Sequence, residues 1–162
     1  RAAAPVTETT AVQWRHMFAV NAEATFHVAR SVAQVMIPRR RGAIVTIAPN
    51  AASVPRAHLA AYAASTAAAV MLTRCLALEL APHGIRCNVV SPRSTDPATL
   101  PATGQAPAGT IAGAVDRWRQ GIPQERIAQP TEIAEAVLFL CSDQARHITM
   151  RELIVDGGAS PT

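Results

Sequence analysis

Tyr62 and Arg56 have side chains that could act directly on a small molecule. A tyrosine hydroxyl is ordinarily protonated at neutral pH, so Tyr62 could donate a hydrogen bond to a carbonyl or a developing enolate. Arg56 could bind a carboxylate through the parallel N–H groups of its guanidinium. The plain alternatives are a structural tyrosine at a helix start and a solvated loop arginine. Both readings stay open at the level of the sequence.

The basic residues limit the available chemistry. All 15 are arginines, so the chain has no lysine. This excludes Schiff bases and every mechanism in which a lysine lowers the pKa of a neighbouring group. The net charge is +4, but aromatic residues make up only 4% of the chain. Because the arginines are scattered apart from residues 39–41, we expect a solvated helix end there and no nucleic-acid partner.

The cysteines and histidines are dispersed along the chain. Cys75, Cys87 and Cys141 are an odd number, and each lies in an apolar segment. This pattern predicts reduced core cysteines in a cytoplasmic protein and no metal site. The chain start lacks an apolar signal core, and we see no apolar run near the ~20 residues that span a bilayer. We therefore expect a cytoplasmic protein without a membrane partner.

The hydrophobic pattern predicts alternating helices and strands. Apolar spacing over residues 12–36 and an alanine-rich segment over 59–81 predict long helices, and a further helix begins at 130 with Thr131 as its cap. Short β-rich runs predict strands at residues 43–48, 85–90 and 153–156, and the continuous apolar run at 43–48 predicts a strand that is covered on both faces. A helix near residues 112–120 and a flexible loop over 94–113 complete the pattern. The alternation predicts one α/β domain over residues 1–162 with a parallel sheet.

Four motifs in this order resemble the short-chain dehydrogenase/reductase family. They are Phe18-Ala19-Val20-Asn21, Tyr62 at the start of the alanine-rich helix, Arg86-Cys87-Asn88-Val89-Val90-Ser91-Pro92, and Asp156-Gly157-Gly158. Other segments are similar to the 2,3-dihydro-2,3-dihydroxybenzoate dehydrogenases of catechol siderophore pathways, among them Pro55-Arg56 and Arg126-Ile127-Ala128. The resemblance implies the C-terminal part of a Rossmann-like, doubly wound parallel sheet, with three strands and long flanking helices.

The chain departs from the family pattern at positions that carry chemistry. The resemblance implies a catalytic Asn, Ser, Tyr and Lys, of which Asn21 and Tyr62 match. Pro49 occupies the Ser position and has no hydroxyl, and Thr66 occupies the Lys position. In the family, that lysine lowers the pKa of the tyrosine and grips the nicotinamide ribose. Arg93 replaces a glycine, where it could fill the space of the nicotinamide.

The cofactor turn of the family is also missing from the sequence. The family carries its glycine-rich dinucleotide turn in a first half, and this chain starts about where that half ends. The eight glycines offer no substitute. We therefore expect a truncated relative with no cofactor of its own.

These losses favour a repurposed enzyme as the main hypothesis. It would perform cofactor-independent dehydration, isomerisation or cyclisation of a small oxygenated metabolite in secondary metabolism. Tyr62 and Asn21 would be catalytic, and the substrate would be bound by Arg56, His58 and Arg93. One alternative is a non-catalytic pseudoenzyme that pairs with itself or with a full-length relative. The other is a part of an NAD-dependent 2,3-dihydro-2,3-dihydroxybenzoate dehydrogenase-like oxidoreductase. In each case the long helices and an uncovered strand edge predict a homodimer or higher homo-oligomer.

Overall fold

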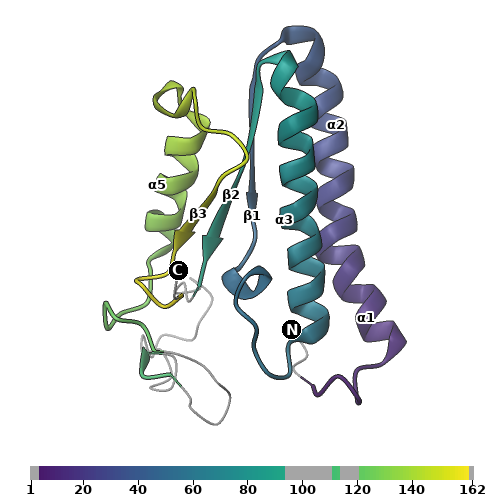
Figure 1. The fold of residues 1–162 in the computed structure, drawn as a ribbon, viewed down its shortest axis with the longest axis vertical. Helices are drawn as coiled ribbons and strands as arrows, with labels where there is room; N and C mark the ends of the chain where they lie inside the picture. The colour runs from purple at the N-terminus through teal and green to yellow at the C-terminus, as the bar shows by residue number, and fades with distance from the viewer. Residues whose placement is uncertain (1–3, 94–110, 114–120, 161–162) are drawn as a thin grey trace.

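The computed structural model describes residues 4–93, 111–113 and 121–160 (Figure 1). Its centre is a parallel sheet with the order β1-β2-β3, formed by Gly42–Ile47, Ile85–Pro92 and Glu152–Val155. The predicted α/β fold and its three strands are confirmed. The predicted loop at 94–113 and helix at 112–120 lie almost entirely outside the described residues.

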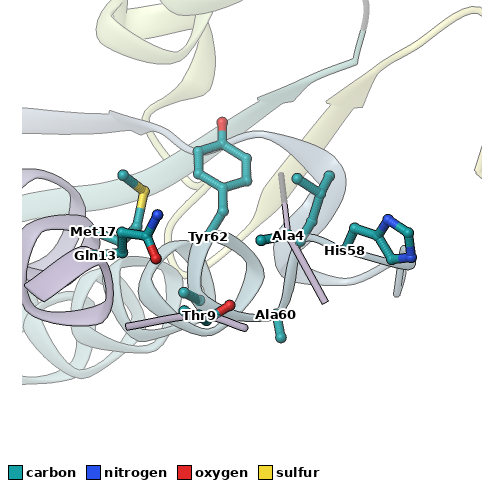
Figure 2. A pocket seen from close by; sticks show the side chains of 9 residues that line it. Ala4, Thr9, Gln13, Met17, His58, Ala60 and Tyr62 are labelled. Carbon is teal, nitrogen blue, oxygen red and sulfur yellow. The ribbon is translucent and has the colours of Figure 1, made fainter. Parts of the chain in front are cut away.

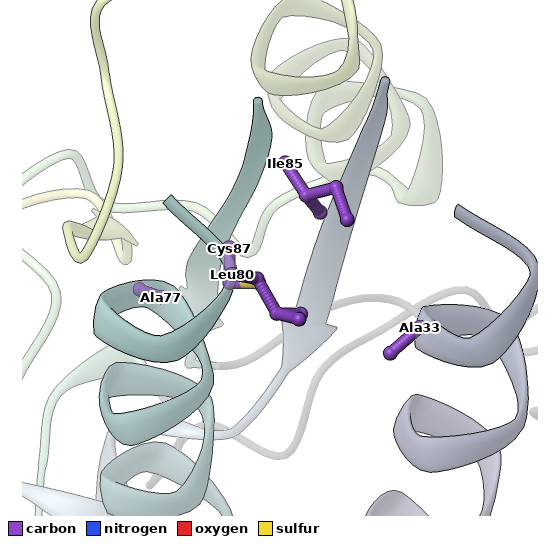
Figure 3. Packing of buried hydrophobic residues seen from close by; sticks show 5 residues of the cluster. All are labelled: Ala33, Ala77, Leu80, Ile85 and Cys87. Carbon is purple, nitrogen blue, oxygen red and sulfur yellow. The ribbon is translucent and has the colours of Figure 1, made fainter. Parts of the chain in front are cut away.

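Helices cover both faces of the sheet. Helices α2 (Ala24–Arg39) and α3 (Ala60–Leu80) pack on one face, and α5 (Pro130–Cys141) packs on the other. This arrangement explains why the β1 and β2 sequences are continuous apolar runs without polar alternation. Figure 3 shows the first core, where Ala33 of α2 and Ala77 and Leu80 of α3 surround Ile85 and Cys87 of β2. The second core packs Val90, Ile133 and Leu140 between the sheet and α5.

The predicted first helix is interrupted. Helix α1 (Ala11–Phe18) begins at a capping box of Thr10 and Gln13, and a π-helical turn, Ala19–Glu23, then connects it to α2. A π-helical turn inside a helix often marks a functional site, and this one contains Asn21. Helix α2 continues through Pro38 and ends at Arg39, and the following cap residue, Arg40, has a left-handed φ of 50°. The hydrophobic spacing could not reveal the π turn, because the apolar stripe runs through it.

Helix α3 carries Tyr62 in its first turn and lies against β2 and α1. The stretch Ala60–His83 is long and apolar enough to cross a membrane by length and composition, which corrects the expectation that no such run exists. This is weak evidence for a membrane span, since the core helix of a soluble protein passes the same test. Its fully buried side chains, such as Ser65 and Ala77, pack within the domain.

The start of α5 differs from the prediction. The N-terminal cap is Gln129 and not Thr131, because Gln129 forms a reciprocal capping box with Glu132. Pro130 is the first residue of the helix, a position where its missing N–H is tolerated. At the other end, the Arg86 guanidinium donates to the carbonyl oxygens of Leu140 (2.6 Å) and Ser142 (3.1 Å). An arginine of β2 thus closes the C-terminus of α5 and ties the helix to the sheet.

Candidate active site

The candidate residues meet at the carboxyl edge of the parallel sheet. Strand β1 leads to Pro49 and the loop with Arg56 and His58, β2 leads to Arg93, and α3 starts beside them with Tyr62. Open α/β sheets bind their ligands at this edge, because the loops that follow the strands converge there.

Asn21 and Tyr62 are brought together through Ser65. The Asn21 side-chain amide donates a 2.8 Å hydrogen bond to Ser65 Oγ, and Ser65 Oγ donates to the Tyr62 carbonyl oxygen at 2.9 Å. The Asn21 carbonyl oxygen accepts from Thr25 Oγ1 at 2.6 Å. The π-helical turn is therefore fastened to the first turn of α3. In this structure Asn21 positions the backbone that carries Tyr62.

Thr66 cannot replace a lysine at this site. Its side chain is buried, and its hydroxyl lies 3.0 Å from both the Tyr62 and Ala63 carbonyl oxygens. The hydroxyl proton is thus directed back to the backbone of the helix. Thr66 places no positive charge beside the Tyr62 ring.

Tyr62 and His58 line a small pocket between α1 and the start of α3 (Figure 2). Thr9, Gln13 and Met17 form its other wall. In the picture the Tyr62 hydroxyl and the His58 imidazole point in different directions. His58 has a left-handed φ of 66°, and its carbonyl oxygen accepts from the Ala4 N–H at 3.1 Å. A non-glycine residue in this conformation stores backbone strain beside the candidate site.

Arg93 contacts the C-terminal segment directly, and Arg56 is linked to it through Asn50. Arg56 Nη2 donates to Asn50 Oδ1 at 2.5 Å, and the Asn50 amide donates to Ser160 Oγ at 2.9 Å. Arg93 Nη1 donates to the Ala159 carbonyl oxygen. Two of the three residues predicted to bind substrate are therefore ordered by neighbouring positions of one segment.

A carboxylate network that the sequence analysis missed supports the same edge. Glu152 at the start of β3 accepts from Arg74 of α3 (2.9 Å), Ser91 of β2 (2.7 Å) and Ser53 of the loop after β1 (3.3 Å). The Glu152 side chain is only 10% exposed. Since the three partners come from α3, β2 and the loop after β1, one carboxylate of β3 locks α3 and the loop to the sheet. The pairing has no local sequence signal.

The clear pKa shifts lie away from this edge. Of the three cysteines predicted to lie in the core, Cys87 is buried, whereas Cys75 and Cys141 are exposed, so the prediction is wrong for these two. Burial raises the pKa of the Cys87 thiol to about 11. A hydrogen bond from Arg126, helped by the Gln129 N–H, lowers the pKa of Glu132 to about 2. Among the described residues, no group of three or more His, Cys, Asp and Glu side chains could hold a metal ion.

Three features define a dehydrogenase-type domain. They are the three-stranded parallel sheet with helices on both faces, the asparagine in the π-helical turn and the tyrosine in the first turn of α3. The chain belongs to the short-chain dehydrogenase/reductase family, and residues 1–160 match the family described as enoyl-(acyl carrier protein) reductase. It is 50% identical over 91% of its length to the 2,3-dihydro-2,3-dihydroxybenzoate dehydrogenase of Bacillus subtilis. It is 47% identical over 97% to the vibriobactin-specific enzyme of that name from Vibrio cholerae. The chain spans 58% and 61% of the lengths of these two relatives.

Solved structures share the fold at lower identity. The gluconate 5-dehydrogenase of Burkholderia cenocepacia, in complex with NADP and tartrate, superposes with a TM-score of 0.85 at 29% identity. The match covers 98% of this chain and 60% of that one.

The main functional hypothesis from the sequence is wrong. Relatives at 47–50% identity are dehydrogenases, so the comparisons contradict cofactor-independent dehydration, isomerisation or cyclisation. They favour the oxidoreductase alternative. The error came from treating Pro49 and Thr66 as a change of reaction class. The comparisons do not test the assignments of Tyr62, Asn21, Arg56, His58 and Arg93, which stay predictions.

Proposed function

We propose that this chain is the substrate-binding part of an oxidoreductase for a carboxylated cyclohexadiene diol of the 2,3-dihydro-2,3-dihydroxybenzoate type. The observation that carries the proposal is the identity of 47–50% with dehydrogenases of that substrate. The gluconate dehydrogenase with the same fold shares only 29%. Since this chain is more similar to the 2,3-dihydro-2,3-dihydroxybenzoate dehydrogenases than to a dehydrogenase of another substrate, the identities support a substrate of the same class for this chain.

The family implies a nicotinamide cofactor, and the residues at the edge fit its reactive end in part. Tyr62 and Asn21 hold the family positions, whereas Thr66 is uncharged and turned into its own helix. When bound, the cofactor would accept the hydride from a ring carbon that bears a hydroxyl group. The remaining chemistry, which is to hold the diol and to move the hydroxyl proton, falls to this chain.

Tyr62 is the group proposed to handle that proton. Oxidation of the alcohol removes a hydride from carbon and a proton from oxygen, and the resulting ketone becomes a catechol by shifting one further proton. A tyrosine hydroxyl at the carboxyl edge can hold the reacting oxygen by a hydrogen bond while the proton leaves. Asn21 acts through Ser65 by fixing the backbone of Tyr62. Because Pro49 and Thr66 supply neither a hydroxyl nor a charge to the reacting oxygen, we expect slow turnover.

The three basic side chains are proposed to bind the substrate carboxylate. Arg93 contacts Ala159, Arg56 is linked to Ser160 through Asn50, and His58 lines the small pocket that Tyr62 also lines. A guanidinium matches a carboxylate with two parallel N–H groups and keeps its charge at all relevant pH values.

A cofactor-dependent assay tests this function. The oxidoreductase that contains this chain is incubated with 2,3-dihydro-2,3-dihydroxybenzoate and NAD, and both 2,3-dihydroxybenzoate and the reduced cofactor are measured. Stoichiometric formation of both is expected, and the Tyr62→Phe variant should lose about 10²–10⁴-fold in rate. Turnover of the diol without any cofactor, or an unchanged rate in Tyr62→Phe, would refute the proposal.

A further inference from the structure

Asn50 is a buried amide at the carboxyl end of β1. Its exposed fraction is 1%, and it opens the short helical turn Asn50–Ala52 directly after Pro49. Its backbone carbonyl oxygen accepts from Ser53 (3.0 Å) and Val54 (2.8 Å). A buried amide without partners would destabilise the fold, so both ends of this side chain need hydrogen bonds.

The two ends of the amide contact different parts of the chain. Oδ1 accepts from Arg56 Nη2 at 2.5 Å, and Nδ2 donates to Ser160 Oγ at 2.9 Å. Ser160 lies 110 residues further along the chain. Asn50 therefore joins the guanidinium of the loop to the segment that follows β3.

The chemical type of this partner matters for the charge of Arg56. An amide oxygen fixes the direction of one guanidinium N–H and adds no negative charge of its own. A carboxylate at the same place would fix the direction and also neutralise the cation. The neighbouring Ala159 carbonyl oxygen, which is likewise neutral, accepts from Arg93. Each arginine thus has one neutral acceptor at this end of the sheet, Asn50 Oδ1 for Arg56 and the Ala159 carbonyl oxygen for Arg93.

We propose that Asn50, supported by Ser160, is a positioning residue that orients the Arg56 guanidinium toward the carboxylate of the substrate. This inference rests on the proposed function, because it takes the carboxylated diol as the ligand. It assigns Asn50 a role in substrate specificity for the anionic group and none in the transfer of the hydride or the proton.

The test separates binding of the carboxylate from turnover. For wild type, Asn50→Ala, Asn50→Asp and Ser160→Ala, KM and kcat are measured with the carboxylated diol and NAD. The inhibition constants of 2,3-dihydroxybenzoate and of catechol, which lacks the carboxylate, are measured in parallel. Ser31→Ala is the control of the same type, because the exposed Ser31 hydroxyl donates to the His27 carbonyl oxygen within α2.

Asn50→Ala is expected to raise KM and the inhibition constant of 2,3-dihydroxybenzoate by about ten- to a hundredfold, the usual effect of a hydrogen bond to a charged group. The constant for catechol and kcat should change little. Asn50→Asp should weaken 2,3-dihydroxybenzoate binding too, since it holds the guanidinium but cancels its charge. Ser160→Ala should give a smaller change of the same pattern, and it keeps the test valid if Asn50→Ala fails to fold.

Equal weakening of 2,3-dihydroxybenzoate and catechol in the Asn50 variants would overturn the inference, since Asn50 would then support only the loop. Wild-type constants in both Asn50→Ala and Ser160→Ala would overturn it as well. A wild-type protein that binds 2,3-dihydroxybenzoate but does not oxidise the diol would instead refute the proposed function. In that case the comparison of the two inhibitors still decides the role of Asn50 by direct titration.

Discussion

Replacing Thr66 with lysine should accelerate the proposed oxidation. Thr66 lies one helical turn after Tyr62, and side chains four residues apart on a helix are neighbours, with Cβ atoms about 5–6 Å apart. A positive charge within about 4–6 Å typically lowers the pKa of an ionisable oxygen by roughly 1–3 units. Each unit multiplies the ionised fraction by about ten, so the reactive tyrosinate should increase by roughly ten- to a thousandfold.

The structure also indicates what the substitution costs. Thr66 is only 3% exposed, so the lysine stem must displace neighbouring atoms and part of the charge must be desolvated. Loss of the Thr66 hydroxyl is tolerable, because its acceptors are carbonyl groups within α3. We therefore expect a gain toward the lower end of that range, with some loss of thermal stability.

The assay for this prediction compares two variants of similar side-chain length. The rates of NAD reduction by Thr66→Lys and Thr66→Met are measured across pH with the carboxylated diol. The lysine variant should be faster, and its pH profile should rise at lower pH than that of wild type. Equal rates in the two variants would refute the argument that Thr66 limits the chemistry by lacking a charge.

Three further predictions concern other parts of the molecule. Cys87 is buried and its pKa is raised to about 11, so alkylation near neutral pH should modify the exposed Cys75 and Cys141 first, as peptide mass spectrometry can show. The pKa of Glu132 is lowered from 4.5 to about 2, so the contribution of its charge to stability is present above about pH 4.5 and lost as the pH falls toward 2. Glu132→Gln should therefore lower the melting temperature at neutral pH but not near pH 2. Exposed apolar side chains lie on α2 and α3, and among the described residues β1 has a neighbouring strand on one side only. We therefore expect an oligomer, for which light scattering should give at least twice the mass of one chain. A soluble monomer would contradict this prediction.

Local sequence signals were sufficient where burial alone determines structure. The predicted strand at 43–48 differs from β1 by one residue at each end, because an apolar run covered on both faces leaves little freedom in its placement. The same signals failed at the π turn around Asn21, whose hydrogen-bond partner Ser65 is 44 residues away. They failed also at Asn50, which is part of no motif and whose hydrogen-bond partner Ser160 lies 110 residues further along the chain.

The sequence indicated the candidate site residues more readily than the hydrogen-bond partners that order their side chains. Tyr62, Arg56 and Arg93 could be selected from the sequence because hydroxyl and guanidinium groups have distinctive chemistry. The acceptors that order these arginines are an asparagine and a backbone carbonyl, which are common throughout any chain. The Arg74–Glu152 ion pair likewise joins residues 78 positions apart, so only the folded sheet brings them into contact.

The functional error shows how a damaged motif and an intact scaffold should be weighed. Loss of a proton-transfer group typically lowers a rate by about 10²–10⁴-fold, which is a change of efficiency and not of reaction type. A change of reaction type would require a different arrangement of substrate and reacting groups. Here the contacts that set the arrangement are in place: Asn21 fastens the turn that carries Tyr62, and Glu152 fastens α3 and the loop to the sheet. Pro49 and Thr66 are therefore consistent with the proposed oxidoreductase at a reduced rate, and the rates of the Thr66 variants test that reduction.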